Sequence, residues 1–354
     1  MSQGRPTLAD VASAAGVSVS TASLAFSGAG PIAPETRSRV LDAATRLGYA
    51  GPNPLGRSLR SGRSGIVAVV IGDQLRRSFR DPVSIQVLDG LVGTLGTMGL
   101  GVLLVPALPA PDGGIALDPL LASAPMDVAV LIWGAHSGDP VLSALQRRGV
   151  PVVVGEGHSA LSVPVVGIED RRGTADLARY LLELGHTRFA SVTLPFAHPR
   201  KAGLVTAGRM AALDWTPTRH RVEGLTDAGV EPVAMWETAG SLVEEGQAAG
   251  RALLDVDDPP TVVVAQSDLL AAGVLLAARE LGLRVPEDVS VAGFDGLDLP
   301  WLAPDVLTTV AQPLALKGET LGNAVGSLLA GEVPEDVSLD VQLQVGTTTG
   351  PPRS

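Results

Sequence analysis

The side chains best placed for chemistry lie between residues 18 and 27, and their chemistry is hydrogen bonding rather than catalysis. Helical spacing in this segment buries Ala22, Ala25 and Phe26 and leaves short side chains on the opposite face. Short side chains can reach base edges while neighbouring hydroxyls hold phosphates, so this segment suits a helix that enters the major groove of DNA. The residues expected on the exposed face are Val19, Ser20, Ser23, Leu24 and Ser27.

Charge is distributed unevenly along the chain, whose net charge is −11. Residues 1–63 carry seven arginines against Asp10, Glu35 and Asp42, a balance of +4. The remaining 291 residues carry 19 basic and 34 acidic groups, a balance of −15. A small basic head on an acidic body indicates that only the head meets a polyanion.

Motifs for catalysis are missing from the sequence. Neither lysine, Lys201 or Lys317, follows a glycine, so there is no phosphate-binding P-loop. The five histidines lack close metal-ligand spacing, no Gly-x-Ser-x-Gly elbow occurs, and the chain contains no cysteine. Residues 28–33 match a relaxed dinucleotide-binding glycine pattern. They lie between predicted helices, whereas a dinucleotide-binding loop follows a strand. We expect no cofactor, no metal and no enzyme activity.

Length and hydropathy place the chain among multidomain globular proteins. Its 354 residues predict two or three domains. No apolar run approaches the roughly 18 residues that cross a bilayer, and the first residues lack an apolar signal core. We therefore expect a soluble protein without a membrane partner, located in the cytoplasm.

The head must position its exposed face with three short helices. Thr7 and Asp10 form a capping box before the first helix, which ends at Gly16, and Ser18 caps the second, 19–26. Two short helices joined by a glycine-containing turn form a helix-turn-helix unit. A third helix, 34–47, stops at Gly48. Its expected buried residues are Val40, Leu41, Ala44 and Leu47.

The body shows alternating strand and helix patterns, which indicate parallel sheets. A linker at 51–54 and a short helix at 55–60 precede it. The expected strands cover 66–71, 102–105, 128–133, 152–154, 189–194, 261–265 and 289–292. The expected helices cover 85–98, 174–184, 242–254, 269–281 and 314–329. Because so many strands exceed one comfortable sheet, we divide the body into two lobes near residue 165.

The order and wording of these motifs resemble the LacI/GalR family of bacterial transcriptional repressors. The resemblance spans nearly the whole chain. It rests on 7–12, 16–18, 21–23, 34–37, 47–49 and 53–59 in the head and hinge, and on 185–188, 265–268, 285–295 and 307–313 in the body.

This resemblance implies an α/β architecture: an all-α helix-turn-helix headpiece and a periplasmic-binding-protein-like core of two doubly wound parallel-sheet lobes, joined by three crossovers. We expect the headpiece at 1–52, a hinge helix and linker at 53–65, and an effector-binding and dimerisation core at 66–354. The N-lobe would comprise about 66–165 plus 296–323, and the C-lobe about 166–295 plus 324–354. Family members are usually homodimers or larger, so a tetramer is also open.

The resemblance also assigns DNA-binding roles. Val19, Ser20 and Leu24 take base-reading positions, and Leu24 replaces a frequent arginine, which favours contact with a thymine methyl over guanine readout. In the hinge, Leu59 would wedge into the minor groove with Arg57 and Arg60 near phosphates. Phosphate-contact positions are occupied by Thr7, Ser18, Thr21, Ser23, Ser27, Thr36, Tyr49 and Asn53. The alternative for each hydroxyl is that it only caps a helix or turn.

A small-molecule effector is expected between the lobes, at the carboxyl ends of strands. Sugar-responsive relatives typically place an arginine where Val205 stands, three residues before Gly208. An ordinary sugar is therefore not predicted; a modified sugar, another metabolite or no effector stay open, and Arg200 or Lys201 could replace that arginine. The expected effector-binding residues are Asp73, Arg80, Trp133, Glu156, Phe196, Arg200, Ser267, Asp268 and Asp295.

The sequence thus predicts a ligand-responsive, sequence-specific DNA-binding regulator. We expect a repressor that binds a palindromic operator as a homodimer, is associated with the nucleoid, and is switched by a small molecule that either induces or corepresses. The alternatives are a solute-binding protein or an enzyme on the same core. The sequence lacks the export signal that the first would need and the catalytic motifs that the second would need.

Overall fold

The structure is a computed structural model that describes residues 6–27, 30–51, 62–72, 75–106, 108–109, 115–133, 139–157 and 163–353. The chain folds as two compact units, Met1–Gly65 and Ile66–Ser354. We call them the head and the core and describe each by itself.

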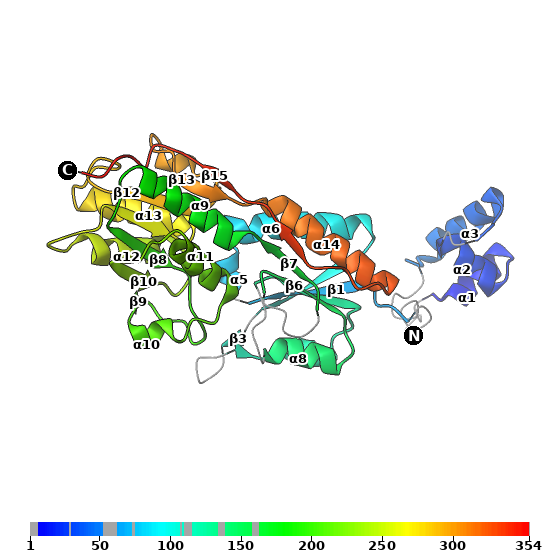
Figure 1. The fold of residues 1–354 in the computed structure, drawn as a ribbon. Coiled ribbons are helices and arrows are strands. Elements are labelled where there is room, and N and C mark those ends of the chain that lie inside the picture. The colour runs from blue at the N-terminus through cyan, green and yellow to red at the C-terminus, as the bar shows by residue number, and fades with distance from the viewer. Residues whose placement is uncertain are drawn as a thin grey trace. The chain divides into compact units, whose positions relative to one another are not determined.

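The head consists of three helices around a small apolar centre (Figure 1). They are α1 (Leu8–Ala15), α2 (Val19–Ser27) and α3 (Pro34–Leu47). The Thr7 amide donates to the Asp10 carboxylate over 2.8 Å, and the Asp10 amide donates to the Thr7 hydroxyl over 3.3 Å. This reciprocal pair satisfies two amides that a helix start leaves open. Val11, Ala22 and Val40 have no solvent exposure and join the three helices.

One expectation about α3 is wrong. Leu41 and Leu47 are 38% and 40% exposed, whereas Ala43 is fully buried beside Val40 and Ala44. The close packing of α3 against the short side chains of α1 and α2 favours the face with two alanines, because a leucine there would hold the helices apart.

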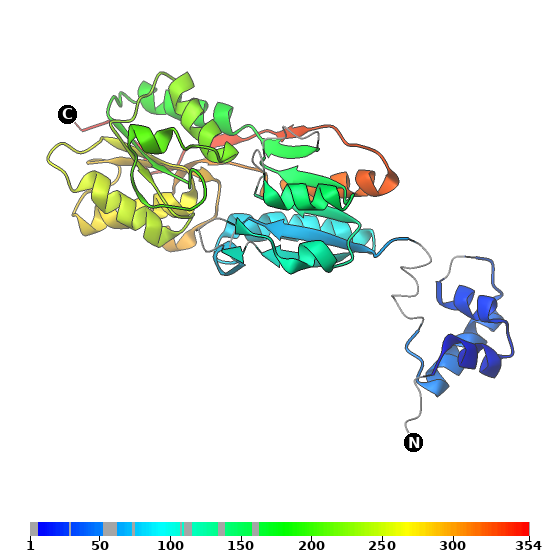
Figure 2. The ribbon, with the colours of Figure 1, turned by 90° about the horizontal axis from the view of Figure 1, so that it is seen from below.

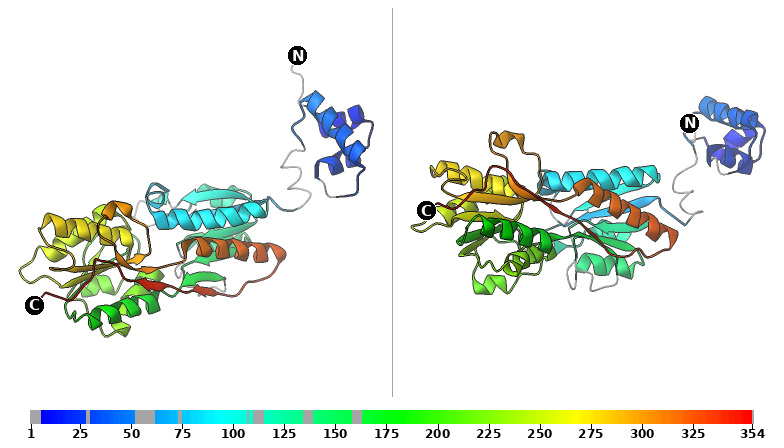
Figure 3. Two further views of the ribbon diagram at one scale, coloured as in Figure 1. Left: turned by 90° about the horizontal axis from the view of Figure 1, so that it is seen from above. Right: turned by 45° about the horizontal axis from the view of Figure 1, so that its top comes forward.

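The first lobe of the core contains a six-stranded parallel sheet in the order β14-β7-β6-β5-β1-β2. Val67, Val69 and Ile71 pack beneath α6 (Pro82–Thr97) and α14 (Leu314–Ala330), which lie side by side in Figure 3. Alternate residues face α7 (Pro119–Ser123) and α8 (Pro140–Arg147) on the other side. The strands are β1 (Ile66–Ile71), β2 (Gly101–Pro106), β5 (Val128–Leu131), β6 (Val152–Gly155), β7 (Val165–Ile168) and β14 (Val337–Leu339). Beside them lie α5 (Leu75–Ser78) and the small β3 (Leu108–Pro109) and β4 (Ile115–Ala116) pair.

The second lobe contains a seven-stranded sheet in the order β15-β13-β12-β11-β8-β10-β9, in which only the edge strands β15 and β9 run antiparallel. Its strands are β8 (Phe189–Thr193), β9 (Gly203–Leu204), β10 (Ala234–Glu237), β11 (Val262–Ala265), β12 (Ser290–Asp295), β13 (Thr308–Ala311) and β15 (Gln342–Gln344). One face is covered by α12 (Val243–Leu254) and α13 (Asp268–Glu280), and the other by α9 (Asp170–Glu183) and α11 (Thr216–Asp227). The short α10 (Ala207–Met210) and a 3-10 turn (Pro300–Leu302) complete it.

The chain passes between the lobes three times, after β7, after β13 and after β14 (Figure 2). The expected lobe boundaries therefore need correction. Strand β13 pairs with β12, so residues 296–312 belong to the second lobe, whereas α14, β14 and β7 belong to the first. Both lobes offer similar apolar strand and helix patterns, so sheet pairing rather than the local pattern decides which lobe a segment joins.

Within the described residues, no single helix is long and apolar enough to cross a membrane. The pair α1 and α2 passes that test only when joined, with a bend of 103° between them.

The missing N-cap of α3 generates a prediction. Ala33 occupies the cap position and its side chain makes no capping hydrogen bond. Ala33→Ser should stabilise α3 by about 1 kcal/mol, because the serine hydroxyl satisfies an open amide. Amide hydrogen exchange of α3 in the full chain measures this, with Ala50→Ser, the same change at an exposed site beyond the helix, as the control. Equal exchange rates in both variants would contradict the prediction.

Candidate functional site

The exposed face of α2 carries the residues expected to read bases. Val19 and Leu24 are 50% and 36% exposed, and Ser20 is also exposed. Ala22 and Ala25 on the opposite face are buried in the centre of the head. A helix anchored on one face in this way presents the other, with short side chains, to a groove.

The hydroxyls next to this face also serve as caps. Ser18 accepts from the Thr21 amide at the start of α2 over 3.1 Å, and its oxygen lies 2.8 Å from the hydroxyl of Thr21. Thr7 belongs to the capping box of α1. Thr7 and Ser18 therefore cap helices in this structure, as the alternative interpretation expected. Both residues are nevertheless exposed, so capping does not bury them.

The other expected DNA contacts are distributed around the head. Ser23 on α2 and Thr36 on α3 are half-buried. Tyr49 is also half-buried, with its ring edge-on to Phe26 at 5.6 Å between centroids. The side chain of Ser27 and the residues Asn53, Arg57, Leu59 and Arg60 lie outside the described part of the structure.

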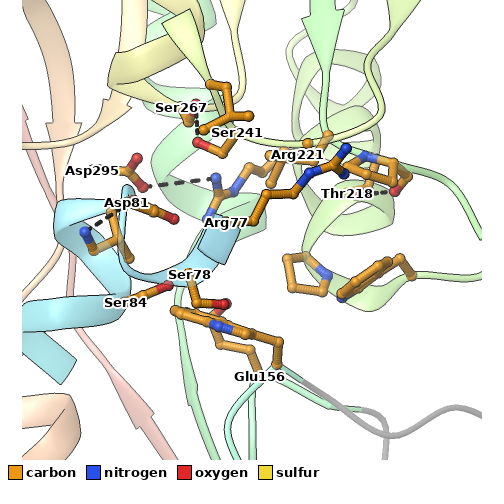
Figure 4. A pocket seen from close by; sticks show the side chains of 18 of the residues that line it. Arg77, Ser78, Asp81, Ser84, Glu156, Thr218, Arg221, Ser241, Ser267 and Asp295 are labelled. Carbon is orange, nitrogen blue, oxygen red and sulfur yellow. Dashed lines mark hydrogen bonds and ion pairs between the residues drawn. The ribbon is translucent and has the colours of Figure 1, made fainter. Parts of the chain in front are cut away.

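The core holds a cavity of about 110 Å³ between its lobes, called here the first compartment (Figure 4). Strands of both sheets end around it: Trp133 follows β5, Ser267 follows β11 and Asp295 ends β12. Two further expected residues, Glu156 after β6 and Arg200, also line it. This placement at carboxyl strand ends is the one expected for ligand sites in parallel α/β sheets.

Three expected residues lie elsewhere. Arg80 forms an exposed ion pair with Glu244. Phe196 is 2% exposed, and its amide donates to Glu237. Asp268 is fully buried behind Asp295, where its carboxylate accepts from the Thr309 hydroxyl and the Leu297 amide over 2.6 and 2.7 Å. Within the described residues, none of the three lines a cavity of the cleft. Asp73 lies outside the described residues.

Sequence reasoning missed other lining residues, among them Arg77, Asp81, Trp215, Thr218 and Arg221. Arg77 of α5 lines the cavity in place of the expected Arg80, which lies three residues further along the chain. Arg221 lies in the middle of α11, away from any strand end. Only the packing of α11 onto the second sheet brings its guanidinium to the cleft, so the local sequence carries no signal for it.

A chain of buried polar groups crosses the cleft from one lobe to the other, and we call it the interlobe chain. Arg221 donates to Asp170 over 2.7 Å and lies 4.0 Å from Asp295. Gln312, in the crossover after β13, donates to Asp295 and accepts from Lys317, each over 2.7 Å. Lys317 in turn contacts Glu156 of the first lobe. The members in order are Asp170, Arg221, Asp295, Gln312, Lys317 and Glu156.

Two carboxylates of the interlobe chain sit on unusual backbone. Among the described non-glycine residues, Glu156 and Asp295 have positive φ values, 57° and 134°. Such conformations cost on the order of 1–3 kcal/mol each and concentrate at functional sites. Both residues line the first compartment, so the strain is located at the cleft between the lobes.

Burial also shifts the acidity of the cleft. Loss of water raises the pKa of Asp81 to about 6, although its carboxylate accepts the Val83 amide as the cap of α6. Desolvation likewise raises the pKa of Asp268 to about 6 and that of Asp295 well above its usual range. Clustering of perturbed acids in a cleft is typical of a functional site.

Three contacts link the lobes at the cleft. The Arg80–Glu244 ion pair closes over 2.7 Å. Arg77 of the first lobe donates to the Ala239 carbonyl of the second over 2.6 Å. In the reverse direction, Arg200 donates to the Gly72 carbonyl over 3.1 Å and stacks on Trp215 at 4.9 Å. These contacts hold the two lobes together at the cleft.

The segment around Val205 does not supply an arginine to the cleft. Val205 is half-buried and, within the described residues, does not line the first compartment. The nearby Arg209 instead pairs with the buried Glu237 over 2.5 Å. Lys201 is exposed, whereas Arg200 reaches the cavity. The guanidinium that enters the cleft from this segment is therefore that of Arg200.

The buried Lys317–Glu156 contact generates a prediction. Lys317→Met leaves Glu156, which is 6% exposed, without its cation, and should lower the free energy of unfolding of the core by about 3–5 kcal/mol. Adding Glu156→Gln should restore most of the loss. Urea denaturation followed by circular dichroism measures both variants, and Lys201→Met at the exposed second lysine is the control. Failure of the double variant to regain stability would contradict the pairing.

The raised pKa of Asp81 predicts a pH effect. The folded-state pKa of about 6 lies above the unfolded value of 3.8, so the folded state binds more protons and its stability falls as pH rises through that window. Asp81→Asn keeps a capping oxygen without the charge. Its unfolding free energy relative to the parent should therefore rise by roughly 1–3 kcal/mol between pH 4 and 7. Urea denaturation across pH, with Asp118→Asn at the cap of α7 as the control, tests this. A pH-independent difference would contradict it.

The family comparisons agree with this architecture. Residues 7–53 match the profile of "Bacterial regulatory proteins, lacI family", and residues 178–349 match that of a periplasmic binding protein-like domain. The HTH-type transcriptional regulator Rv3575c of Mycobacterium tuberculosis is 34% identical over 98% of this chain and 98% of its own length.

Solved structures share the fold over nearly the whole chain. A transcriptional regulator CelR in complex with cellobiose is 28% identical, with a TM-score of 0.67 over 97% of this chain and 100% of the other. A Lac repressor dimer bound to operator and the anti-inducer ONPF has a TM-score of 0.80 at 23% identity, over 98% of this chain and 100% of the other. The chain belongs to the lacI family of bacterial regulatory proteins, whose members matched here are DNA-binding transcriptional regulators and not enzymes.

Proposed function

We propose that this regulator is a repressor that binds a palindromic operator as a homodimer, and that a small molecule in the first compartment switches its affinity for DNA. The observation that carries the proposal is the exposed α2 face of Val19, Ser20 and Leu24 on a head whose other side is packed. Leu24 offers apolar contact to a thymine methyl, and the hydroxyls of the head offer phosphate contacts. Such a protein acts on chromosomal DNA in the cytoplasm.

The switch that we propose uses the interlobe chain. A ligand can change operator affinity only if it binds two states of the core with different free energy. Asp295 and Glu156 reach the first compartment from opposite lobes and are joined through Gln312 in a crossover. A ligand that hydrogen-bonds to these carboxylates therefore favours one arrangement of the lobes. The CelR relative binds cellobiose, which supports a carbohydrate in this position.

The second copy would dock on the α6 side of the first lobe. Ile85 and Val92 lie seven residues apart on α6 and are 42% and 44% exposed, and Leu316 of α14 is 48% exposed. An apolar stripe of this kind is suited to a self-complementary two-fold contact. A Lac repressor of the same fold is a dimer on its operator.

DNA selected from a random library by the full-length protein tests the proposal. Binding should saturate at two chains per palindrome, measured by analytical ultracentrifugation. The affinity, followed by fluorescence anisotropy, should fall about 10³-fold or more between 50 and 200 mM salt if six or more phosphates are contacted. A salt-independent affinity, or no preference for any selected sequence, would overturn the proposal.

A matched pair of variants locates the reading surface. Leu24→Ala should lower affinity for the selected site by about 10-fold and leave non-specific binding unchanged, because a lost base contact costs about 1–3 kcal/mol. Leu41→Ala removes a comparably exposed leucine from α3 and should leave both affinities unchanged. Equal effects of the two substitutions would exclude α2 as the reading helix.

A further inference from the structure

A small cavity lies inside the second lobe, where its sheet packs against α9 and α11. Its volume is about 10 Å³, and we call it the inner cavity. The lining residues are all buried, and they include Thr174, Ser191 and Arg221. The volume is at the lower end of the roughly 10–15 Å³ that a single water molecule needs. The inner cavity therefore admits one water and excludes any larger ligand.

Two hydroxyl groups in the inner cavity have no hydrogen-bond partner among the described residues. They are Thr174 Oγ1 and Ser191 Oγ. Thr174 is 2% exposed and Ser191 has no exposed surface, so bulk water does not reach either oxygen. A buried hydroxyl without a partner has lost its hydrogen bonds to water and gained none in return, which costs free energy and is rare in native proteins. Both hydroxyls therefore require a partner inside the cavity.

The packing of α9 and α11 onto the sheet brings these two hydroxyls together. Ser191 lies two residues after Phe189 on β8 and pairs with Val264 of β11, so its side chain is on the sheet face that these helices cover. Thr174 is on the buried face of α9. A Cβ atom on Gly224 of α11 would lie only 2.8 Å from the Cβ of Thr174. The two helices are thus in close contact beside Thr174, and this contact keeps its hydroxyl away from solvent.

Arg221 supplies a third polar group to the inner cavity. Its guanidinium has five N–H donors. Its hydrogen bonds to the described residues start from Nε and Nη1, which donate to Asp170 and to the Gln266 carbonyl. The donors of Nη2 are therefore available to a ligand. Two hydroxyls and a guanidinium offer three hydrogen bonds, the usual number for a buried water, and the positive charge disfavours a cation in this space.

Arg221 also connects the inner cavity with the cleft. The same side chain lines the first compartment, where Figure 4 shows it. Its guanidinium carbon lies 3.7 Å from the ring centre of Phe294, which is a second lining residue of the inner cavity. A ligand in the inner cavity would therefore contact a member of the interlobe chain from the interior of the second lobe.

We propose that the inner cavity is a binding site for one structural water molecule, which is hydrogen-bonded to Thr174 Oγ1, to Ser191 Oγ and to the guanidinium of Arg221. This water satisfies both buried hydroxyls and supports Arg221 from within the lobe. Because the site lies entirely in the second lobe, the inference is independent of the proposed function.

A high-resolution crystal structure of the full-length protein tests the site directly. One ordered water oxygen should lie within about 3.2 Å of both Thr174 Oγ1 and Ser191 Oγ. Crystals of the double variant Thr174→Val, Ser191→Ala should lack this water, because too few polar partners are left to hold it. An inner cavity without electron density in the parent protein, or a water that persists in the double variant, would overturn the proposal.

Urea denaturation measures what the water contributes in solution. Tryptophan fluorescence reports on the core alone, since all four tryptophans lie in it. Each single substitution, Thr174→Val or Ser191→Ala, should raise the unfolding equilibrium constant about 3- to 10-fold, because the water loses one hydrogen bond and the other hydroxyl loses its partner. Thr226→Val, the same change at an exposed site on α11, is the matched control and should leave the constant nearly unchanged.

The double variant distinguishes a shared water from two separate hydroxyls. If one water joins them, the effect of the double variant should be smaller than the product of the two single effects. Hydroxyls that have no partner at all predict the opposite sign, because each substitution would then remove an unsatisfied group and stabilise the core. Stabilisation by either single substitution, or independent effects of the two, would overturn the proposal.

Discussion

The arrangement of the core depends on the interlobe chain, a row of buried charges in which each lobe pairs its own cation and Gln312 connects the two pairs. Arg221 is 3% exposed and Lys317 is 1% exposed, so each is stable only beside a carboxylate. Their partners come from segments more than 50 residues away in sequence, Asp170 for Arg221 and Glu156 for Lys317. Gln312 joins the two pairs from within a crossover. The chain that connects the lobes thus contains Asp295 and Glu156, two carboxylates that line the cleft.

The interlobe chain also determines which groups line the cleft. Beside these charged groups, the cleft is lined by hydroxyls and by Trp133 and Trp215. Glu156 and Asp295, which both have positive φ values, also line that space. The guanidinium groups of Arg77 and Arg200 each donate to a backbone carbonyl of the opposite lobe.

The head and the core differ in how their interiors are packed. The head has a small centre of alanines and valines, so capping at Thr7 and close helix packing contribute a large share of its stability. The core buries two doubly wound sheets and can therefore support buried charge at its cleft. In the head, Ala33 leaves the start of α3 without a side-chain cap, and Leu41 is 38% exposed.

The sequence by itself determined the helices of the head, the exposed face of α2 and the main strands, because caps, turns and hydrophobic periodicity are local signals. It also placed Trp133, Glu156 and Asp295 at strand ends, where parallel sheets position ligands. Only the tertiary structure decided that β13 joins the second lobe, that α14 returns to the first, and that Arg221 and Lys317 meet at the cleft. Those outcomes depend on pairing between segments far apart in the chain, for which residue spacing carries no information.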